Sequence, residues 1–132
     1  EISLGLVGSE MCIRDRLNET YFISMHQSNL LSLQRLDGVN TSQLQYVYGA
    51  EDFNKTTSVT SSVISWCINN QIDLDTRQSL VTASDVYRLQ TAGRQVNVWT
   101  VNKADDLQYF IDEAADFITT NEPELLLDLL KK

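Results

Sequence analysis

The sequence predicts an α/β fold in which helices cover a parallel sheet. Short apolar segments of strand length alternate with segments whose apolar residues recur at helical spacing. The strand-like segments begin roughly two dozen residues apart, which is typical of successive strand–helix units and not of hairpins. No glycine-rich phosphate loop follows any of them. That absence argues against a nucleotide-binding version of the fold.

Five segments have the composition of buried strands, because they are short and rich in aliphatic, β-branched or aromatic residues. The first two combine aromatic and apolar residues, and the second ends at Gly49. The third is short and carries two aspartates, and the fourth has the longest apolar pattern. In chain order the expected strands are Tyr21–Met25, Leu44–Tyr48, Ile72–Asp75, Gln95–Val101 and Asp116–Thr119.

The first two expected helices follow the first two strands. Ser28 can cap a helix that carries a run of leucines and ends at Gly38. Thr60 or Ser61 can start the next helix, and the pair Asn69–Asn70 ends it.

Three more helices are expected in the second half of the chain. Thr82 and Asp85 have the spacing of a capping box, and the helix that follows them ends at Gly93. Residues Ala104–Ala114 place apolar side chains at helical spacing on one face. Pro123 suits the first turn of a last helix, where its missing N–H costs little.

Two topologies have this order of elements: an open doubly wound sheet and an arc of a (βα)₈ barrel. Hydrophobic periodicity does not separate them. A complete barrel usually takes about 250 residues, whereas this chain has 132. A barrel topology would therefore mean that the chain forms only part of a barrel.

Composition argues against several classes of protein. The formal net charge of −8 argues against nucleic-acid binding, because neutralising phosphates needs clustered Lys and Arg. No apolar run approaches the ~18 residues of a membrane span. The cysteines, Cys12 and Cys67, have no metal-like spacing, and a free buried Cys67 suits a reducing compartment. A bacterial protein fits the same cysteine usage, so a cytoplasmic location is favoured, and a membrane domain elsewhere in the parent protein stays open.

Residues 1–16 do not resemble the start of a domain. They have neither the long apolar centre nor the cleavage site of a signal peptide. Residues 8–16, Gly-Ser-Glu-Met-Cys-Ile-Arg-Asp-Arg, resemble the translated sequencing-adaptor read-through found at the ends of metagenomic reading frames. We interpret 1–16 as a non-native extension and 17–132 as the protein domain. A native N-terminal extension is the alternative.

Polar residues in the loops after the strands are candidates for function, because parallel α/β folds place their sites there. His26 is the only histidine, so it cannot form a paired acid and base, and a surface or capping role is favoured. Ser24 lacks the Gly-x-Ser-x-Gly elbow of a nucleophile. Four carboxylates could bind a hard cation, but without the spacing of a calcium loop they are favoured as solvated loop residues. They are Glu51, Asp52, Asp73 and Asp75.

Two segments near the C-terminus carry a family resemblance. Val96–Asn102 ends in Trp-Thr-Val-Asn, and Asp116–Pro123 ends in Thr-Asn-Glu-Pro. They resemble the seventh and eighth strands of the glycerophosphodiester phosphodiesterases, which are TIM barrels. The residues alone favour core packing for Trp99. The resemblance implies instead that Trp99 lines the substrate pocket and that Asn102 lies at the mouth of the same loop.

The resemblance runs through most of residues 17–132, although only these two segments are specific to the family. Met25 stands where the family often has Phe after a Ser, and Ala114 and Phe117 replace glycines that flank the aspartate of the last strand. The resemblance implies an α/β fold that is a partial TIM barrel of about five C-terminal βα units.

The family hydrolyses glycerophosphodiesters to glycerol 3-phosphate and an alcohol, using a divalent cation such as Ca²⁺ or Mg²⁺. Its His-Arg-Gly, Glu-x-Asp, His-Asp and Glu-x-Lys motifs carry the catalytic and metal-binding groups, and none is present here. We therefore assign no catalytic residue and no metal ligand. We expect a small-molecule glycerophosphodiester as the ligand of the parent enzyme, and an inactive fragment that binds no cation.

Two alternatives remain open. One is a non-enzymatic α/β binding or interaction module, and the other is a barrel half that assembles with a partner chain. An arc of a barrel would expose sheet edges at its first and last strands. Self-association through those edges is therefore expected.

Overall fold

The computed structural model describes residues 20–36, 38–40, 43–49 and 58–131 of the chain. The expected non-native extension, residues 1–16, lies outside this part, as do the loop carboxylates Glu51 and Asp52. Among the described residues, no helix is both long enough and apolar enough to cross a bilayer.

The described residues form a five-stranded, fully parallel sheet whose spatial order follows the chain order. A doubly wound sheet would reverse its strand order at a switch point, and this sheet does not. The sequential order therefore decides between the two topologies, and the predicted partial barrel is confirmed. The strands are β1 (Phe22–Ser24), β2 (Leu44–Tyr48), β3 (Asp73–Arg77), β4 (Val96–Trp99) and β5 (Phe117–Ile118).

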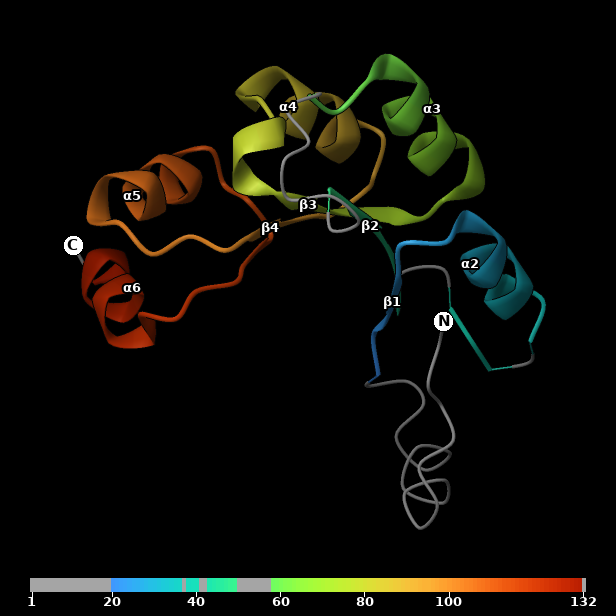
Figure 1. Cartoon of the computed structure of the whole chain (residues 1–132), viewed down its shortest axis with the longest axis horizontal. Coiled ribbons are helices and arrows are strands. Elements are labelled where there is room, and N and C mark those ends of the chain that lie inside the picture. The colour runs from blue at the N-terminus through green and yellow to red at the C-terminus, as the bar shows by residue number, and fades with distance from the viewer. Residues whose placement is uncertain (1–19, 37, 41–42, 50–57, 132) are drawn as a thin grey trace, which may run out of the picture.

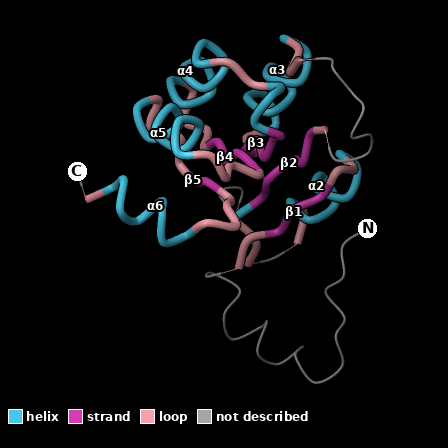
Figure 2. Tube along the Cα trace, turned by 60° about the vertical axis from the view of Figure 1, so that its left-hand side comes forward, coloured by secondary structure: helices cyan, strands magenta, loops and turns pink. Residues whose placement is uncertain are grey.

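Helices cover the outer side of this arc of strands (Figure 1). Figure 2 shows the same arrangement from a second direction, with the strands in the middle and α3, α4 and α5 above them. Each strand is followed by a helix, as βα units require. The helices are α2 (Gln27–Gln34), α3 (Ser61–Asn70), α4 (Ala83–Thr91), α5 (Ala104–Asp112) and α6 (Pro123–Leu130), and a short 3₁₀ helix, η3 (Gln78–Leu80), follows β3.

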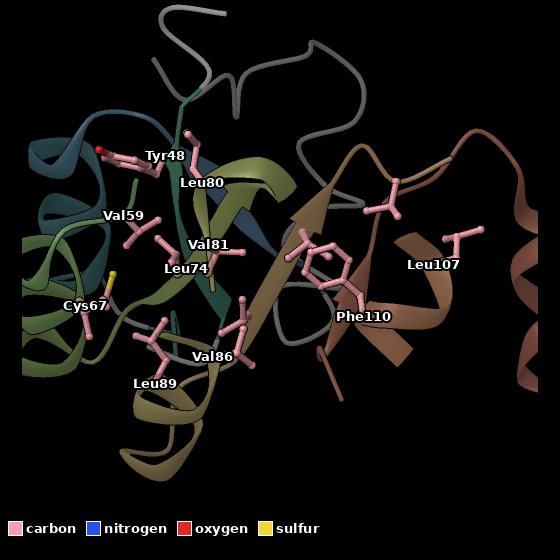
Figure 3. Packing of buried hydrophobic residues seen from close by; sticks show 14 residues of the cluster. Tyr48, Val59, Cys67, Leu74, Leu80, Val81, Val86, Leu89, Leu107 and Phe110 are labelled. Atoms are coloured by element: carbon pink, nitrogen blue, oxygen red, sulfur yellow. The ribbon is translucent and has the colours of Figure 1, made fainter. Parts of the chain in front are cut away.

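Alternate residues of the strands build the core between sheet and helices. Leu74 of β3 and Val96 and Val98 of β4 are fully buried there, together with Leu89 of α4. Figure 3 shows this cluster, in which Leu74, Val86 and Leu89 lie near one another and Phe110 and Leu107 of α5 extend it to the right of the view. Full burial of one such side chain contributes roughly 1.5–3 kcal/mol. A second cluster lies under α2 and consists of Phe22, Leu30, Leu33, Leu44 and Ile72.

The helix starts confirm two predictions and correct one. The side chain of Thr60 accepts the backbone N–H of Val63, and Thr82 forms the predicted capping box with Asp85. Ser28 is not a cap, and that prediction is wrong. The first helix already begins at Gln27, because His26 adopts the extended N-cap conformation just before it.

Candidate functional site

The inner face of the sheet, which points away from the helices, carries a cavity of about 620 Å³. We call it the inner cavity. All five strands or the residues beside them contribute to it, in line with the two-residue periodicity of strands. Aromatic, aliphatic and polar side chains share its wall. It is lined by Tyr21, Ile23, Gln45, Val47, Asp75, Asn97, Trp99, Thr100, Phe117 and Thr119.

The sheet curls enough for its two ends to meet across the inner face. The rings of Tyr21, just before β1, and Phe117, in β5, have centroids 5.5 Å apart at an interplanar angle of 73°. Edge-to-face aromatic pairs of this kind contribute about 0.5–1.5 kcal/mol beyond the area they bury. Residues from opposite ends of the sheet thus form one wall of the inner cavity, as expected inside a barrel.

Trp99 ends β4 and is half-buried. It lines the inner cavity and also a second cavity of about 710 Å³ that includes Arg77, Gln78, Tyr109 and Phe110. The indole therefore borders two hollows at the carboxyl ends of the strands, where parallel α/β proteins place their sites. The structure puts Trp99 on a cavity wall and not in the helix-covered core. A role in binding substrate stays a prediction.

Asp75 lies in the middle of β3, next to Val47 of β2 and Asn97 of β4. Asp75 is 5% exposed and lines the inner cavity together with Trp99. Its Oδ1 atom has no hydrogen-bond partner among the described residues. Burial raises the pKa of Asp75 from 3.8 to about 7, and the nearby polar side chain of Trp99 opposes part of that rise.

Asp73, two residues earlier on the same face, has different partners. Its Oδ1 accepts the backbone N–H of Gln95 at 3.0 Å and lies 3.4 Å from Nη1 of Arg94. The contact with Arg94 is an ion pair without the alignment of a hydrogen bond. Burial raises the pKa of Asp73 to about 6, although the bond from Gln95 and the charge of Arg94 oppose the rise. We conclude that Asp73 joins the start of β3 to the segment that leads into β4.

The burial of Asp73 and Asp75 corrects a prediction. Both were expected to be solvated loop carboxylates, but β3 extends to Arg77 and holds them within the sheet. The inner face of a curled sheet can bury polar residues, so alternation of polar and apolar residues does not mean exposure here. The alternation in Ile72–Asp73–Leu74–Asp75 was the signal that could have placed both carboxylates on one face of a strand.

Asn102, the second residue predicted to contact substrate, joins two loops. Its Oδ1 accepts the backbone N–H of Asn121 at 2.9 Å and the hydroxyl of Thr120 at 3.3 Å. The loop after β4 is thereby fastened to the loop after β5. Asn102 is exposed and does not line either of the two cavities described above. Direct contact of Asn102 with substrate stays a prediction.

The remaining candidates have structural partners. His26 is exposed, and its backbone N–H donates to the hydroxyl of the buried Ser24 at 3.0 Å. His26 occupies the N-cap position of α2, but its side chain makes no capping hydrogen bond. Burial and the charge of Asp73 raise the pKa of Cys67 to about 12, so the thiol stays protonated and is a poor nucleophile.

The described residues do not suit a divalent cation. No group of three or more His, Cys, Asp or Glu side chains among them could hold a metal ion. Ca²⁺ and Mg²⁺ need several oxygen ligands around one point. Asp73 is engaged by Arg94 and Gln95, and no second carboxylate of the described residues shares the inner cavity with Asp75. We therefore assign no step of any reaction to a metal on these residues.

Comparison with solved structures supports the fold, whereas comparison of the sequence finds no relative. No protein-family model matches the chain, and no curated protein matches its sequence. Solved structures do match it at TM-scores of 0.65 to 0.71. One is a phosphodiesterase from Oleispira antarctica in complex with the product sn-glycerol 3-phosphate, at 15% identity over 83% of this chain. A protein assigned as a glycerophosphoryl diester phosphodiesterase from Silicibacter pomeroyi has a TM-score of 0.71 and 19% identity over 92% of this chain.

A third structure is a glycerophosphodiester phosphodiesterase from Parabacteroides distasonis, with a TM-score of 0.70 and 21% identity over 93% of this chain. This chain spans 41%, 41% and 48% of the three structures, in the order given. At these identities the likeness shows a shared fold. It extends over 83% to 93% of this chain, and more than half of each solved chain lies outside it.

Proposed function

We propose that this chain is part of a glycerophosphodiester phosphodiesterase, to which it contributes one side of the barrel and a wall of the substrate pocket. The observation that carries the proposal is the likeness to phosphodiesterase structures over most of this chain. The sheet of this chain also has the sequential strand order of a barrel. The position of Trp99 supports it, because the indole lines a cavity at the carboxyl ends of the strands.

The proposed reaction is hydrolysis of a glycerophosphodiester to glycerol 3-phosphate and an alcohol. In this scheme Trp99 gives the glycerol end an apolar surface, and Asn102 holds the loops after β4 and β5 in one arrangement. The groups that transfer protons and bind a divalent cation would come from outside the described residues. This division of roles predicts that the chain alone does not turn over substrate.

A chimera tests the proposal. Residues 20–131 of this chain would replace the matching segment of the Parabacteroides distasonis enzyme, and release of glycerol 3-phosphate from glycerophosphodiesters would be measured. We expect hydrolysis by the chimera, a rise in KM when Trp99→Ala is introduced, and no hydrolysis by this chain alone. Circular dichroism would establish that each protein is folded. A folded but inactive chimera, or turnover by this chain alone, would contradict the proposal.

A further inference from the structure

The wall of the inner cavity contains a carboxyl group without an oppositely charged neighbour. Asp75 lies on this wall, is 5% exposed, and has one oxygen, Oδ1, with no hydrogen-bond partner among the described residues. Burying a carboxylate costs free energy unless a positive charge or hydrogen-bond donors compensate it. None of the described residues that line the cavity is Lys, Arg or His. The cavity wall thus carries a negative charge without the matching positive one.

The arginines near β3 serve other places. Arg77 follows Asp75 by two residues on β3, and it lines the second cavity but not the inner cavity. Arg94 pairs with Asp73 at the start of the same strand. The register places Val47 of β2 and Asn97 of β4 beside Asp75, and neither is charged. A bound ligand can therefore supply the positive charge that the wall lacks.

Aromatic rings make up much of the remaining wall. Trp99 lines the cavity together with Tyr21 and Phe117, whose rings are in contact at a centroid distance of 5.5 Å. The face of an aromatic ring attracts a cation, and the attraction grows where water is excluded. Aromatic and aliphatic walls also cover the carbon atoms of a ligand. Rings beside a carboxylate therefore favour an organic cation over a neutral ligand.

The oxygen acceptors of the cavity suit a primary ammonium group. Gln45 and Asn97 line the cavity with Asp75, and each has an amide oxygen that can accept an N–H. The Oδ1 of Asn97 accepts the hydroxyl of Thr119 at 3.3 Å and has a second lone pair. An ammonium group donates three hydrogen bonds, which matches one carboxylate and two amides. Ca²⁺ would need about six or more oxygen ligands, and a quaternary ammonium group donates no hydrogen bond.

We propose that the inner cavity binds a small organic molecule through its primary ammonium group, which pairs with the carboxylate of Asp75. The amide oxygens of Gln45 and Asn97 accept its other N–H groups, and the aromatic rings cover its carbon atoms. The volume of about 620 Å³ is typical of small-molecule sites. This inference goes beyond the proposed hydrolysis, because binding of the cation needs no catalytic group.

The test follows binding by nuclear magnetic resonance of the whole isotope-labelled chain, with propylammonium as the probe. The chain has two tryptophans and so two indole N–H signals, and Trp66→Phe identifies that of Trp66. Trp99 lines the inner cavity, whereas Trp66 of α3 packs against Tyr46 at a centroid distance of 5.3 Å. Burial raises the pKa of Asp75 to about 7, so the titration is made at pH 8, where the carboxyl group is ionised. We expect millimolar propylammonium to shift the Trp99 signal and to leave the Trp66 signal in place.

Two further probes, used at the same ionic strength, separate the contributions of charge and hydrogen bonding. 1-Propanol has the same carbon chain without the charge, and tetramethylammonium has the charge without an N–H to donate. Each should bind at least about tenfold more weakly than propylammonium, because a hydrogen bond between charged groups contributes enough free energy for such a change. Equal affinity for 1-propanol would overturn the ion pair. Equal affinity for tetramethylammonium would overturn the assignment to a primary ammonium group.

Two substitutions locate the site. Asp75→Asn keeps the size of the side chain but removes its charge, and should weaken the binding of propylammonium at least about tenfold. Asp73→Asn is the matched control, because it removes the other buried carboxyl group of β3, which does not line the inner cavity. It should leave the affinity unchanged. Circular dichroism would establish that both variants are folded.

Unchanged affinity in the Asp75→Asn variant would overturn the proposal, as would a Trp99 signal that does not respond to propylammonium in the wild-type chain. If the Asp75→Asn variant does not fold, the comparison of the three probes on the wild-type chain still decides. These measurements involve no hydrolysis. An inactive chimera with the expected binding would therefore refute the enzymatic function alone, and an active chimera without binding of propylammonium to this chain would refute the ammonium site alone.

Discussion

The buried carboxyl group of Asp75 makes a direct prediction about stability. Its pKa is about 7 in the folded chain, against an ordinary value of 3.8. The unfolded chain therefore loses the proton at lower pH than the folded chain does, and stability falls as pH rises between these two values. Above pH 7 the loss is complete. Below about pH 3.8 both states hold the proton, and the effect is absent.

The size of the loss follows from the shift. The difference between about 7 and 3.8 is about 3 units, and each unit corresponds to 1.36 kcal/mol, which gives about 4 kcal/mol. This is an upper limit, because water that enters the inner cavity would hydrate the carboxylate. Asp75→Asn removes the ionisation and should therefore flatten the dependence of stability on pH. If the Asn side chain itself lowers the free energy of unfolding, it does so equally at every pH. That cost therefore does not affect the slope of stability against pH.

Urea unfolding followed by circular dichroism at pH 4.5, 6, 7 and 8.5 measures these slopes. We expect the free energy of unfolding to fall more steeply with pH in the wild-type chain than in the Asp75→Asn variant. Asp73 has a pKa of about 6 and is present in both proteins. Its contribution to the pH slope is therefore the same in both and cancels when the two slopes are subtracted. Equal slopes would show that Asp75 ionises as it does in the unfolded chain, and would refute the account of its burial.

Three further predictions concern packing, capping and assembly. Leu74→Ala, at a fully buried position of β3, should cost about 2–5 kcal/mol in urea unfolding, and a cost below 1 kcal/mol would contradict the described core. Thr82→Ala removes the cap of α4 and should cost about 1 kcal/mol, whereas the exposed Ser84→Ala should cost almost nothing. The open edges at β1 and β5 should let the chain self-associate, so light scattering should give a mass above 15.0 kDa; a monomer at all concentrations would contradict this.

Local chemistry in the sequence predicted much of the fold. The second strand, Leu44–Tyr48, was predicted with the bounds it has in the structure, because its apolar and aromatic residues are flanked by polar residues and a glycine. The caps at Thr60 and Thr82 were predicted from side chains that satisfy free backbone N–H groups. The order of the strands in the sheet was not predicted. Pairing between strands depends on contacts between residues far apart in the chain, and hydrophobic periodicity does not reveal those contacts.

The candidate site was predicted only in part. Trp99 was singled out through a family resemblance, and the structure places it on the wall of two cavities. Asp75 was taken for a loop residue, because a carboxylate inside a sheet has the same local sequence pattern as one at its edge. Its place beside Asn97 on the wall of the inner cavity depends on the register between β3 and β4. That register follows from the packing of the whole sheet and not from any short segment.

The central proposal is that this chain is an arc of a phosphodiesterase barrel. The most direct measurement is the sequence of the genomic DNA upstream of the codon for Leu17. The account predicts an open reading frame, continuous with this one, that encodes a His-Arg-Gly strand and a Glu-x-Asp pair. A stop codon immediately upstream, or an in-frame domain of another fold without these motifs, would contradict it.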